Sequence, residues 1–431
     1  MKSGLNYKLS ELAQLKIHFI GIGGAGMSGI ARIMLAKGFS ISGSDKSDSS
    51  TLTALKALGA KIYVGHAAEN LADTQLVIVS SAITENNPEF AEAKSRGIPI
   101  AARAVALAWL MSESTSVAVA GTHGKTTTTA MLTVALQSAG LDPSFAIGGT
   151  INTAGINAHS GSGSIFVAEA DESDGSFLAY KPTGAIITNV ELDHVDHFAD
   201  EEAVYAVFED FISSIKDDGF LVACGDDPGV KTLLSRITRS DLKIYLYGKG
   251  SSNDFRIDQI NLAPNSSRAI ISITGRKVGE LNLTVVGEHN LLNALAAFAA
   301  ATAMGGSEEK LLAGLKAFTG TRRRFELKGE VGGIKVIDDY GHHPTEVLVT
   351  LKAARNLAGA GRVIVIFQPH RYSRTAAFTN QFSNSLALAD FTYLLEVYAA
   401  SEKPIPGVSS LLIARGMKAE QVKFEPSMLQ V

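Results

Sequence analysis

The sequence predicts an α/β protein of three consecutive domains, with boundaries near residues 112 and 318. Short apolar runs that end in glycine or polar residues alternate with helix-like segments, which indicates parallel sheets with helical crossovers. A serine-rich stretch at 112–116 and the segment 319–324 interrupt this alternation. A chain of 431 residues is long enough for roughly two to four domains. We therefore expect domains at 1–112, 113–317 and 318–431.

The expected elements follow in chain order. In the first domain we predict strands at 16–22, 39–42 and 76–80, a tight glycine loop at 23–29 and a helix at 30–37. In the second we predict strands at 117–120, 165–169, 185–189 and 220–224, and a long helix from Thr126. Alternating apolar residues over 243–287 predict an antiparallel β segment, and an alanine-rich helix follows at 290–303. In the third we predict strands at 335–337 and 362–367, which both end in charged clusters.

Composition and charge exclude several classes of protein. The net charge is −4 and no basic face is evident, so we expect no nucleic-acid partner. The single cysteine, Cys224, excludes an internal disulfide framework and a cysteine metal cage. The apolar run at 17–22 leads into a glycine turn, and no apolar stretch is long enough to cross a bilayer. We therefore expect a cytoplasmic protein without a membrane partner.

The segment GTHGKTT lies between a predicted strand and a predicted helix, which is the setting of a phosphate-binding loop. The usual Walker A pattern has a glycine where this chain has Val119, so the match is to the variant G-T-x-G-K-T. Backbone N–H groups of such a loop surround phosphate oxygens, while Lys125 reaches the terminal phosphates and Thr126 can ligate Mg²⁺. The expected ATP contacts are Gly121, Thr122, His123, Gly124, Lys125, Thr126 and Thr127.

Acidic residues and histidines follow two further strands of the second domain. Glu169 stands in VAEADESDGSF and His194 in TNVELDHVDHF. The carboxyl ends of parallel strands meet at one edge of a sheet, where ligands bind. A carboxylate and a neutral imidazole there can hold a divalent ion that bridges nucleotide phosphates. Three neighbours of His194 are alternatives for this role: Asp193, Asp196 and His197.

A first glycine loop, GIGGAGMSG, follows the first strand. It contains G-x-G-x-x-G in two overlapping registers, and Asp45 stands near the expected acidic position. This pattern alone would suit a dehydrogenase that binds NAD. What the loop provides physically is a pyrophosphate site at a helix N-terminus, so the diphosphate of a nucleotide sugar fits equally well.

Two polar clusters, DDYGHHPTE and FQPHRYSRT, each follow a strand of the third domain. Arg371 and Arg374 can hold a carboxylate or a phosphate by forked hydrogen bonds. Tyr340 and His342 offer further polar contacts, and 322–324 forms another basic group near the domain boundary. For His343 an alternative is that it only caps the local backbone before Pro344.

Eight motifs in order resemble those of the Mur ligases of peptidoglycan synthesis. They are GIGGAGMSG, GTHGKTTT, VAEADESD, TNVELDHVDH, GEHNLLNALAA, GTRRRFE, DDYGHHPTE and FQPHRYSRT. The resemblance implies an N-terminal Rossmann-like UDP-sugar domain, a central P-loop ATPase domain and a C-terminal Rossmann-like domain. It also implies ATP- and Mg²⁺-dependent ligation of L-alanine to the lactyl carboxylate of UDP-N-acetylmuramate through an acyl phosphate. Alternatives are a ligase that attaches a preformed tripeptide to the same sugar, and a non-catalytic nucleotide-binding regulator.

The resemblance also implies roles for individual residues. The catalytic set is Lys125, Glu169, His194, Arg324 and Asp339, and the metal ligands are Thr126, Glu169 and His194. His289, Asn290, Asn293 and Arg324 join the phosphate loop in binding ATP. UDP-sugar contacts are Gly21, Gly23, Gly24, Ala25, Gly26, Met27, Ser28, Asp45, Ser80 and Ser81. L-alanine contacts are Tyr340, His342, Arg371 and Arg374.

The chain departs from the family pattern at two points. Several Mur ligases carry a carbamylated lysine where this chain has Phe208, so we expect no carbamate. Family members usually continue beyond the position of Val431 with another strand-rich segment, so we expect a shortened third domain. For the assembly we expect a monomer or a weak homodimer.

Overall fold

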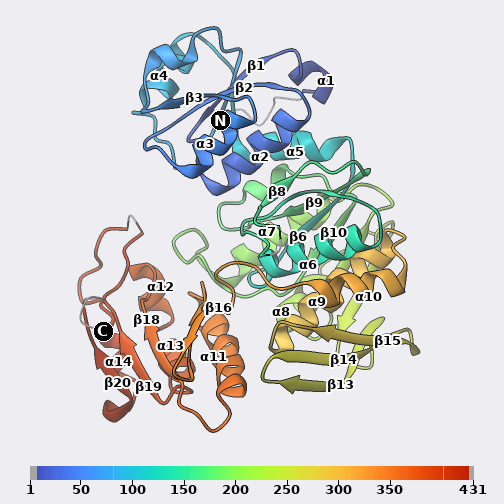
Figure 1. Ribbon diagram of the computed structural model, residues 1–431, viewed down its shortest axis with the longest axis vertical. Coiled ribbons are helices and arrows are strands. Elements are labelled where there is room, and N and C mark those ends of the chain that lie inside the picture. The colour runs from blue at the N-terminus through green and yellow to red at the C-terminus, as the bar shows by residue number, and fades with distance from the viewer. Residues whose placement is uncertain (1–6, 81, 153, 401, 427–431) are drawn as a thin grey trace.

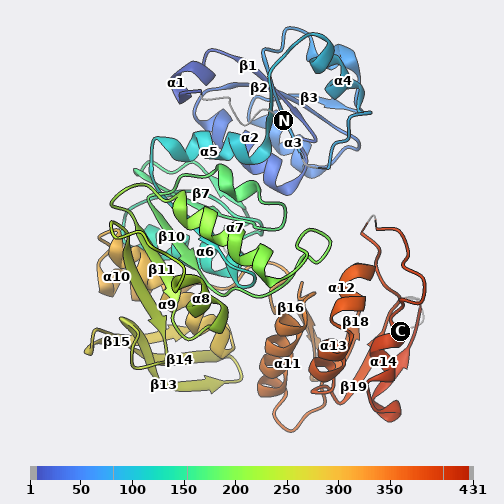
Figure 2. The ribbon, with the colours of Figure 1, turned by 180° about the vertical axis from the view of Figure 1, so that it is seen from behind.

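The computed structural model describes residues 7–80, 82–152, 154–400 and 402–426, and Ser81, an expected sugar contact, lies outside them. Three lobes follow one another along the chain (Figure 1). The N-terminal lobe rests on the central one, and the C-terminal lobe stands beside the central lobe, as the view from behind also shows (Figure 2). Within the described ranges no helix is both long and apolar enough to cross a membrane.

The N-terminal lobe is built on a five-stranded parallel sheet in the order β3-β2-β1-β4-β5. Its strands are β1 (Lys16–Ile20), β2 (Ser40–Asp45), β3 (Lys61–Val64), β4 (Leu76–Val79) and β5 (Ile100–Ala102). Its helices are α1 (Leu9–Leu12), α2 (Ala25–Ala36), α3 (Ser50–Ala57), η1 (Ala68–Leu71), α4 (Pro88–Ser95) and α5 (Arg103–Ser112). The strand order reverses at β1, so the glycine loop after β1 lies at the point where such sheets bind ligands.

The central lobe has a ten-stranded sheet in the order β15-β14-β13-β12-β11-β10-β6-β9-β7-β8. Its strands are β6 (Thr115–Ala120), β7 (Ser144–Ala146), β8 (Ala158–His159), β9 (Ile165–Glu169), β10 (Gly184–Ile187), β11 (Phe220–Cys224), β12 (Lys243–Gly248), β13 (Phe255–Ala263), β14 (Ser266–Ile273) and β15 (Arg276–Leu283). Its helices are α6 (Lys125–Ser138), η2 (Ser176–Ala179), α7 (Glu201–Ser213), α8 (Pro228–Leu234), α9 (Glu288–Ala303) and α10 (Glu308–Ala317). Strands β12 to β7 run parallel, and β13 to β15 form an antiparallel extension.

The C-terminal lobe combines an antiparallel hairpin with a three-stranded parallel sheet. Its strands are β16 (Glu326–Val331), β17 (Ile334–Asp338), β18 (Ile364–Phe367), β19 (Phe391–Leu394) and β20 (Val422–Phe424). Its helices are α11 (Pro344–Ala358), α12 (Tyr372–Ala377), α13 (Thr379–Leu386), α14 (Leu411–Arg415) and η3 (Ala419–Gln421). This lobe has a core of its own, against which Leu192 and Val195 of the central lobe pack.

Several sequence-based bounds are corrected by the structure. Helix α2 begins at Ala25 rather than at residue 30, because Gly24 already takes the extended N-cap conformation. The expected linker at 112–116 shrinks to residues 113 and 114, since Thr115 pairs with Ile165 in the sheet. The expected antiparallel segment from residue 243 begins only at β13, because β12 pairs in parallel with β11.

Two further positions differ in their surroundings from what their sequence pattern indicates. The strand predicted at 335–337 belongs to a hairpin and not to the parallel sheet, because Gly332 and Gly333 both have positive φ and close a tight turn onto β16. Phe208, on α7, is fully buried edge-to-face against Phe177, with ring centroids 5.8 Å apart. The Phe208 side chain is therefore a packing element of the central core.

Candidate functional site

The phosphate loop joins β6 to α6, and at both of its glycines a side chain would clash with neighbouring residues. Gly121 has a φ of +125°, and a Cβ there would lie 2.1 Å from the Thr188 hydroxyl. Gly124 has a φ of +82°, and a Cβ there would lie 2.7 Å from the Asn293 side-chain oxygen. The backbone N–H of His123 donates to Asn189 Oδ1 at 2.8 Å. The loop is thus held between the end of β10 and helix α9, in a conformation that requires glycine.

The Lys125 side chain is only 12% exposed and makes four hydrogen bonds. Its Nζ donates to the carbonyl oxygens of Gly121 (2.8 Å) and Thr122 (3.1 Å) and to both carboxylate oxygens of Glu172 (3.0 and 2.8 Å). Burial opposes the charge of Lys125, yet the carboxylates of Glu172 and Asp171 raise its pKa above the ordinary value. Lys125 is therefore protonated, and its ammonium group lies against the loop that we expect to bind phosphates.

Sequence reasoning missed Glu172 as a site residue. The only signal was its place in VAEADESD, three residues after Glu169. Burial raises the pKa of Glu172 to about 7, against the attraction of Lys125. Among the residues that the structure describes, Lys125 is the cationic partner of this carboxylate, so we expect Glu172 to compete with a phosphate for that lysine.

The expected metal ligands line one cavity of about 480 Å³ but fall into two groups. Thr126 Oγ1 donates to Glu169 Oε1 at 2.9 Å, and the Gly148 N–H donates to Glu169 Oε2 at 2.7 Å. His194, whose φ is +49°, instead lies with two carboxylates that the sequence reading did not assign. Donor atoms of His194, Asp171 and Glu172 all lie within 4.8 Å of one another.

This donor set fits Mg²⁺. Burial lowers the pKa of His194, so its ring is neutral at pH 7 and has a lone pair to offer. The hydroxyl of Thr126 and the carboxylates of Glu169 and Asp171 provide the oxygen ligands that Mg²⁺ prefers. Asp171 was not assigned from the sequence.

The other face of the phosphate loop borders a second cavity, of about 410 Å³, at the start of α9. It contains the expected ATP contacts His289, Asn290 and Asn293, together with Thr127. Asn290 Nδ2 donates to the Val286 carbonyl oxygen at 2.7 Å. Burial lowers the pKa of His289 to about 4, so the ring is neutral and can accept one hydrogen bond and donate another.

Arg324 borders both cavities, and Asp339 supports the segment that carries it. The Arg324 guanidinium lies 3.3 Å from Glu346 Oε1 and 5.5 Å from the ring centre of Tyr340. Asp339 accepts hydrogen bonds from the backbone N–H of Phe325 and of Gly341, both at 2.7 Å. Burial raises the pKa of Asp339. In this arrangement Asp339 fixes the backbone beside Arg324, and it also borders the cavity at α9.

Tyr340, His342, Arg371 and Arg374 come from the C-terminal lobe and all line the 480 Å³ cavity opposite Lys125. The two arginines are already paired with the central lobe. Arg374 is only 2% exposed, and its Nε donates to Asp193 Oδ1 at 2.8 Å, whereas Arg371 pairs with Asp196. Asp193 and Asp196, which were alternatives to His194 as metal ligands, therefore serve as anchors for these arginines. His197, the third alternative, packs against Phe198.

The first glycine loop lies apart from these cavities, in the N-terminal lobe. Gly21, with a φ of +81°, donates its N–H to the Ser44 carbonyl oxygen, and the Gly23 N–H donates to Asp45 Oδ2 at 2.9 Å. Gly24 caps α2, and the Ala25 carbonyl oxygen accepts from Asn157 Nδ2 at 2.9 Å. The acidic residue expected near this loop is thus in contact with it.

The side chains of three expected sugar contacts of this lobe make local contacts, and Ser80 also borders Gly21. Met27 is packed in the core, and the Ser28 hydroxyl donates to the Ala25 carbonyl oxygen at 3.1 Å. The hydroxyl oxygen of Ser80 accepts the Ala82 N–H at 3.3 Å. A Cβ on Gly26 would lie 2.7 Å from a guanidinium nitrogen of Arg103, so this arginine borders the loop. Sequence reasoning missed Arg103, because it is distant in the chain and lies in no glycine motif.

Comparisons with known proteins agree along the whole chain. Models of the Mur ligase family match residues 16–115 (Mur ligase family, catalytic domain), 119–301 (middle domain) and 323–431 (glutamate ligase domain). A UDP-N-acetylmuramate–L-alanine ligase from Renibacterium salmoninarum is 51% identical over 98% of this chain and 90% of its own length.

Two solved structures are also similar. The UDP-N-acetylmuramate-alanine ligase of Thermotoga maritima superposes with a TM-score of 0.79 at 30% identity, covering 96% of this chain and 91% of its own. A murein peptide ligase from Psychrobacter arcticus gives a TM-score of 0.72 at 27% identity, covering 96% and 92%. With three family models along its length and a relative at 51% identity, this chain belongs to the Mur ligase family.

Proposed function

We propose that this chain ligates L-alanine to the lactyl carboxylate of UDP-N-acetylmuramate, with ATP as the energy source, and so forms a precursor of peptidoglycan. The observation that carries the proposal is one cavity with two chemically different walls. The phosphate loop with Lys125 forms one wall, and Arg371, Arg374 and His342 of the C-terminal lobe form the other. Relatives at about half identity over nearly the full length act on this pair of substrates by name.

Activation of the carboxylate is the first step. A free carboxylate is a poor acylating agent, so one of its oxygens attacks the γ-phosphorus of ATP and ADP leaves. Lys125 would release Glu172 and face the transferring phosphoryl group, where its charge is worth more than in water. Arg324, on the border of both cavities, would approach the phosphates from the opposite side.

Thr126, Glu169 and His194, with Asp171 beside them, would hold Mg²⁺, which when bound neutralises phosphate charge as a Lewis acid. Glu169 already holds the Thr126 hydroxyl, so this pair is oriented before any ligand arrives. The neutral His194 ring faces the same cavity. These residues would therefore align the phosphate chain for in-line attack.

Amide formation is the second step. The neutral amine of L-alanine attacks the acyl carbon, the acyl–oxygen bond to phosphate breaks, and inorganic phosphate leaves. Arg371, paired with the partly exposed Asp196, would exchange that partner for the alanine carboxylate. Arg374, which is buried and pairs with Asp193, would position Arg371 and His370. Contact between the central and C-terminal lobes would exclude water from the acyl phosphate.

The N-terminal lobe would bind the UDP part of the sugar. The N-terminus of α2, which no side chain caps at Gly24, suits a diphosphate, and Arg103 adds a positive charge beside Gly26. We propose residues 1–112, 113–317 and 318–431 as the sugar-binding, nucleotide-binding and amino-acid-binding domains.

Phosphate release tests the proposal when it is measured with UDP-N-acetylmuramate and each amino acid in turn, with product masses recorded. We expect release that requires both co-substrates, and the mass of UDP-N-acetylmuramoyl-L-alanine. Faster turnover with a preformed tripeptide would assign the chain to the peptide-attaching ligases instead. Binding of ATP without any amide product would favour a non-catalytic regulator.

A further inference from the structure

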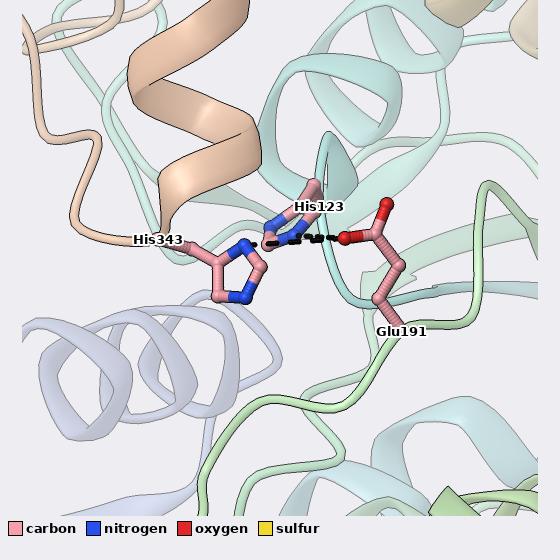
Figure 3. A group of neighbouring side chains, drawn as sticks. All are labelled: His123, Glu191 and His343. Atoms are coloured by element: carbon pink, nitrogen blue, oxygen red, sulfur yellow. Dashed lines mark ion pairs between the residues drawn. The ribbon is translucent and has the colours of Figure 1, made fainter. Parts of the chain in front are cut away.

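Three donor side chains from three separate segments meet behind the phosphate loop, outside the 480 Å³ cavity, and two of them, His123 and Glu191, also border the 410 Å³ cavity at α9. His123 belongs to the loop itself, Glu191 to the segment after β10, and His343 to the first turn of α11 in the C-terminal lobe (Figure 3). Donor atoms of the three residues all lie within 4.8 Å of one another. His123 Nε2 lies 3.7 Å and His343 Nδ1 lies 4.0 Å from the same atom, Glu191 Oε2.

We propose that His123, Glu191 and His343 form a binding site for a divalent transition ion of the zinc type, separate from the Mg²⁺ ligands. Two imidazoles and one carboxylate are a donor set that zinc, cobalt and nickel favour, whereas Mg²⁺ prefers oxygen atoms. The His123 and His343 side chains are nearly buried, so the ligands are largely shielded from bulk water. This inference does not depend on the proposed ligase reaction.

The contacts of His123 direct its Nε2 toward the centre of the site, where an ion would take the place of the Nε2 proton. Its Nδ1 lies 3.5 Å from Glu346 Oε1, which favours a proton on Nδ1. Its Nε2, which faces Glu191, is buried and has no hydrogen-bond partner among the residues that the structure describes. A carboxylate behind a ligating histidine is the usual outer support of a metal site, and Glu346 has that position.

The other two ligands are oriented as well. Thr345 Oγ1 donates to Glu191 Oε2 at 2.7 Å and holds this carboxylate toward the histidines. The two rings are 4.6 Å apart between centroids and inclined by 34°. His343 also confirms the capping alternative, because its Nδ1 accepts the Thr345 N–H at 3.3 Å, a long bond that an ion would replace. Ligands around tetrahedral zinc are about 3.3 Å apart, so modest side-chain rotations close the site.

A groove lined by Glu191, His343 and Thr345 gives an ion access from the side of α7 and α8. The competitor for the site is a proton. Burial opposes the charge of His123, but Glu191 and Glu346 raise its pKa to about 9. Burial and the charge of His123 lower the pKa of His343 to about 4, although the nearby carboxylates Asp193, Glu191 and Glu346 act in the opposite direction. An ion that binds here displaces the proton from the His123 ring, so protons and the ion compete for the site.

Cobalt(II) is the probe, because its visible absorption reports imidazole and carboxylate ligands directly. The full chain is titrated with Co²⁺ in excess Mg²⁺, without ATP, and Zn²⁺ is then added to displace it. We expect one Co²⁺ per chain, and at least tenfold weaker binding in His343→Gln and in Glu191→Gln. The matched control His159→Gln changes a partly exposed histidine on β8, and should bind like the wild type.

A second control separates this site from the Mg²⁺ ligands. His194→Gln should keep the Co²⁺ spectrum, because His194 is not a member of the triad. Equal affinity of the wild type, His343→Gln and Glu191→Gln would overturn the proposal, and so would loss of binding in His194→Gln alone. Circular dichroism checks the fold of each variant. If His343→Gln does not fold, the Co²⁺ affinity of Glu191→Gln tests the proposal instead.

Discussion

The loop after β6 and the loop after β1 have the same plan of strand, glycine turn and helix, but each lies next to a buried carboxylate of a different kind. Beside the phosphate loop, Glu172 has one cationic partner, Lys125, and burial raises its pKa to about 7. Beside the first glycine loop, the carboxylate is Glu89, which is also fully buried.

Glu89 is surrounded by donors. Its oxygens accept from the Ser44 hydroxyl at 2.5 Å and from Asn70 Nδ2 at 2.6 Å, and His66 Nδ1 lies 3.1 Å away. Burial alone would raise the pKa of Glu89, but His18, Ser44 and Asn70 lower it to about 2. A carboxylate with several hydrogen-bond donors, such as Glu89, stabilises the fold. A carboxylate with a single cationic partner, such as Glu172, can release that partner to a ligand. The contrast therefore concerns the two carboxylates: Glu89 is satisfied within the fold beside the first loop, whereas Glu172 depends on the lysine of the phosphate loop.

The largest expected effect is on the lysine. Lys125→Met should lower the rate of L-alanine-dependent phosphate release by about 1000-fold, because it removes the charge that faces the transferring phosphoryl group. Lys231→Met, at an exposed position on α8, is the matched control and should be active. A loss of less than tenfold in Lys125→Met would remove this lysine from the reaction.

The second effect is on stability and pH. In the folded protein the pKa of Glu89 is about 2 instead of 4.5, so its contribution is present above about pH 4.5 and is lost as the pH falls toward 2. The shift corresponds to about 3 kcal/mol. Glu89→Gln should lower the free energy of unfolding of the N-terminal lobe by about that much at pH 7 and flatten its acid dependence. Fluorescence of Trp109, the single tryptophan, reports this lobe.

For that measurement Glu85→Gln is the control, since Glu85 is exposed and pairs with Lys94 at the surface. If Glu89→Gln and Glu85→Gln unfold alike between pH 3 and 7, the contrast between the two buried carboxylates fails.

The third effect compares the glycines. In Gly121→Ala the new Cβ would meet the Thr188 hydroxyl at 2.1 Å in a backbone conformation that alanine avoids, so the loop must move. We expect kcat/KM for ATP to fall by about 100-fold. In Gly26→Ala the new Cβ meets only the flexible end of Arg103, so the KM for the UDP-sugar should rise by about tenfold with little change for ATP. Equal losses for both substrates in both variants would contradict separate roles.

The smallest effect concerns Glu172. If its carboxylate competes with phosphates for Lys125, Glu172→Gln should tighten the binding of ADP by about tenfold in isothermal titration calorimetry. Asp174→Asn, two residues further on, is a matched control and should bind ADP as the wild type does. Weaker ADP binding in Glu172→Gln would mean that the carboxylate supports Lys125 in the complex instead of competing with the ligand.

Local features were predictable from the sequence, and features that depend on packing between lobes were not. The phosphate loop could be predicted because its glycines, Lys125 and the following helix are adjacent in the chain. The residues alone did not decide between His194, Asp193 and Asp196 as the metal ligand. The reason is that the two aspartates form ion pairs with Arg371 and Arg374, which belong to another lobe. Within one lobe, the start of α2 at Ala25 was missed because glycine as an N-cap gives a weak sequence signal.

The measurement that tests the central claim most directly follows an oxygen atom. UDP-N-acetylmuramate labelled with ¹⁸O in its lactyl carboxylate is turned over with ATP and L-alanine, and the mass of the released phosphate is measured by mass spectrometry. If Lys125 faces a phosphoryl group on its way to the sugar acid, each phosphate carries one labelled oxygen from the carboxylate. Phosphate that contains oxygen only from ATP and water would contradict this account.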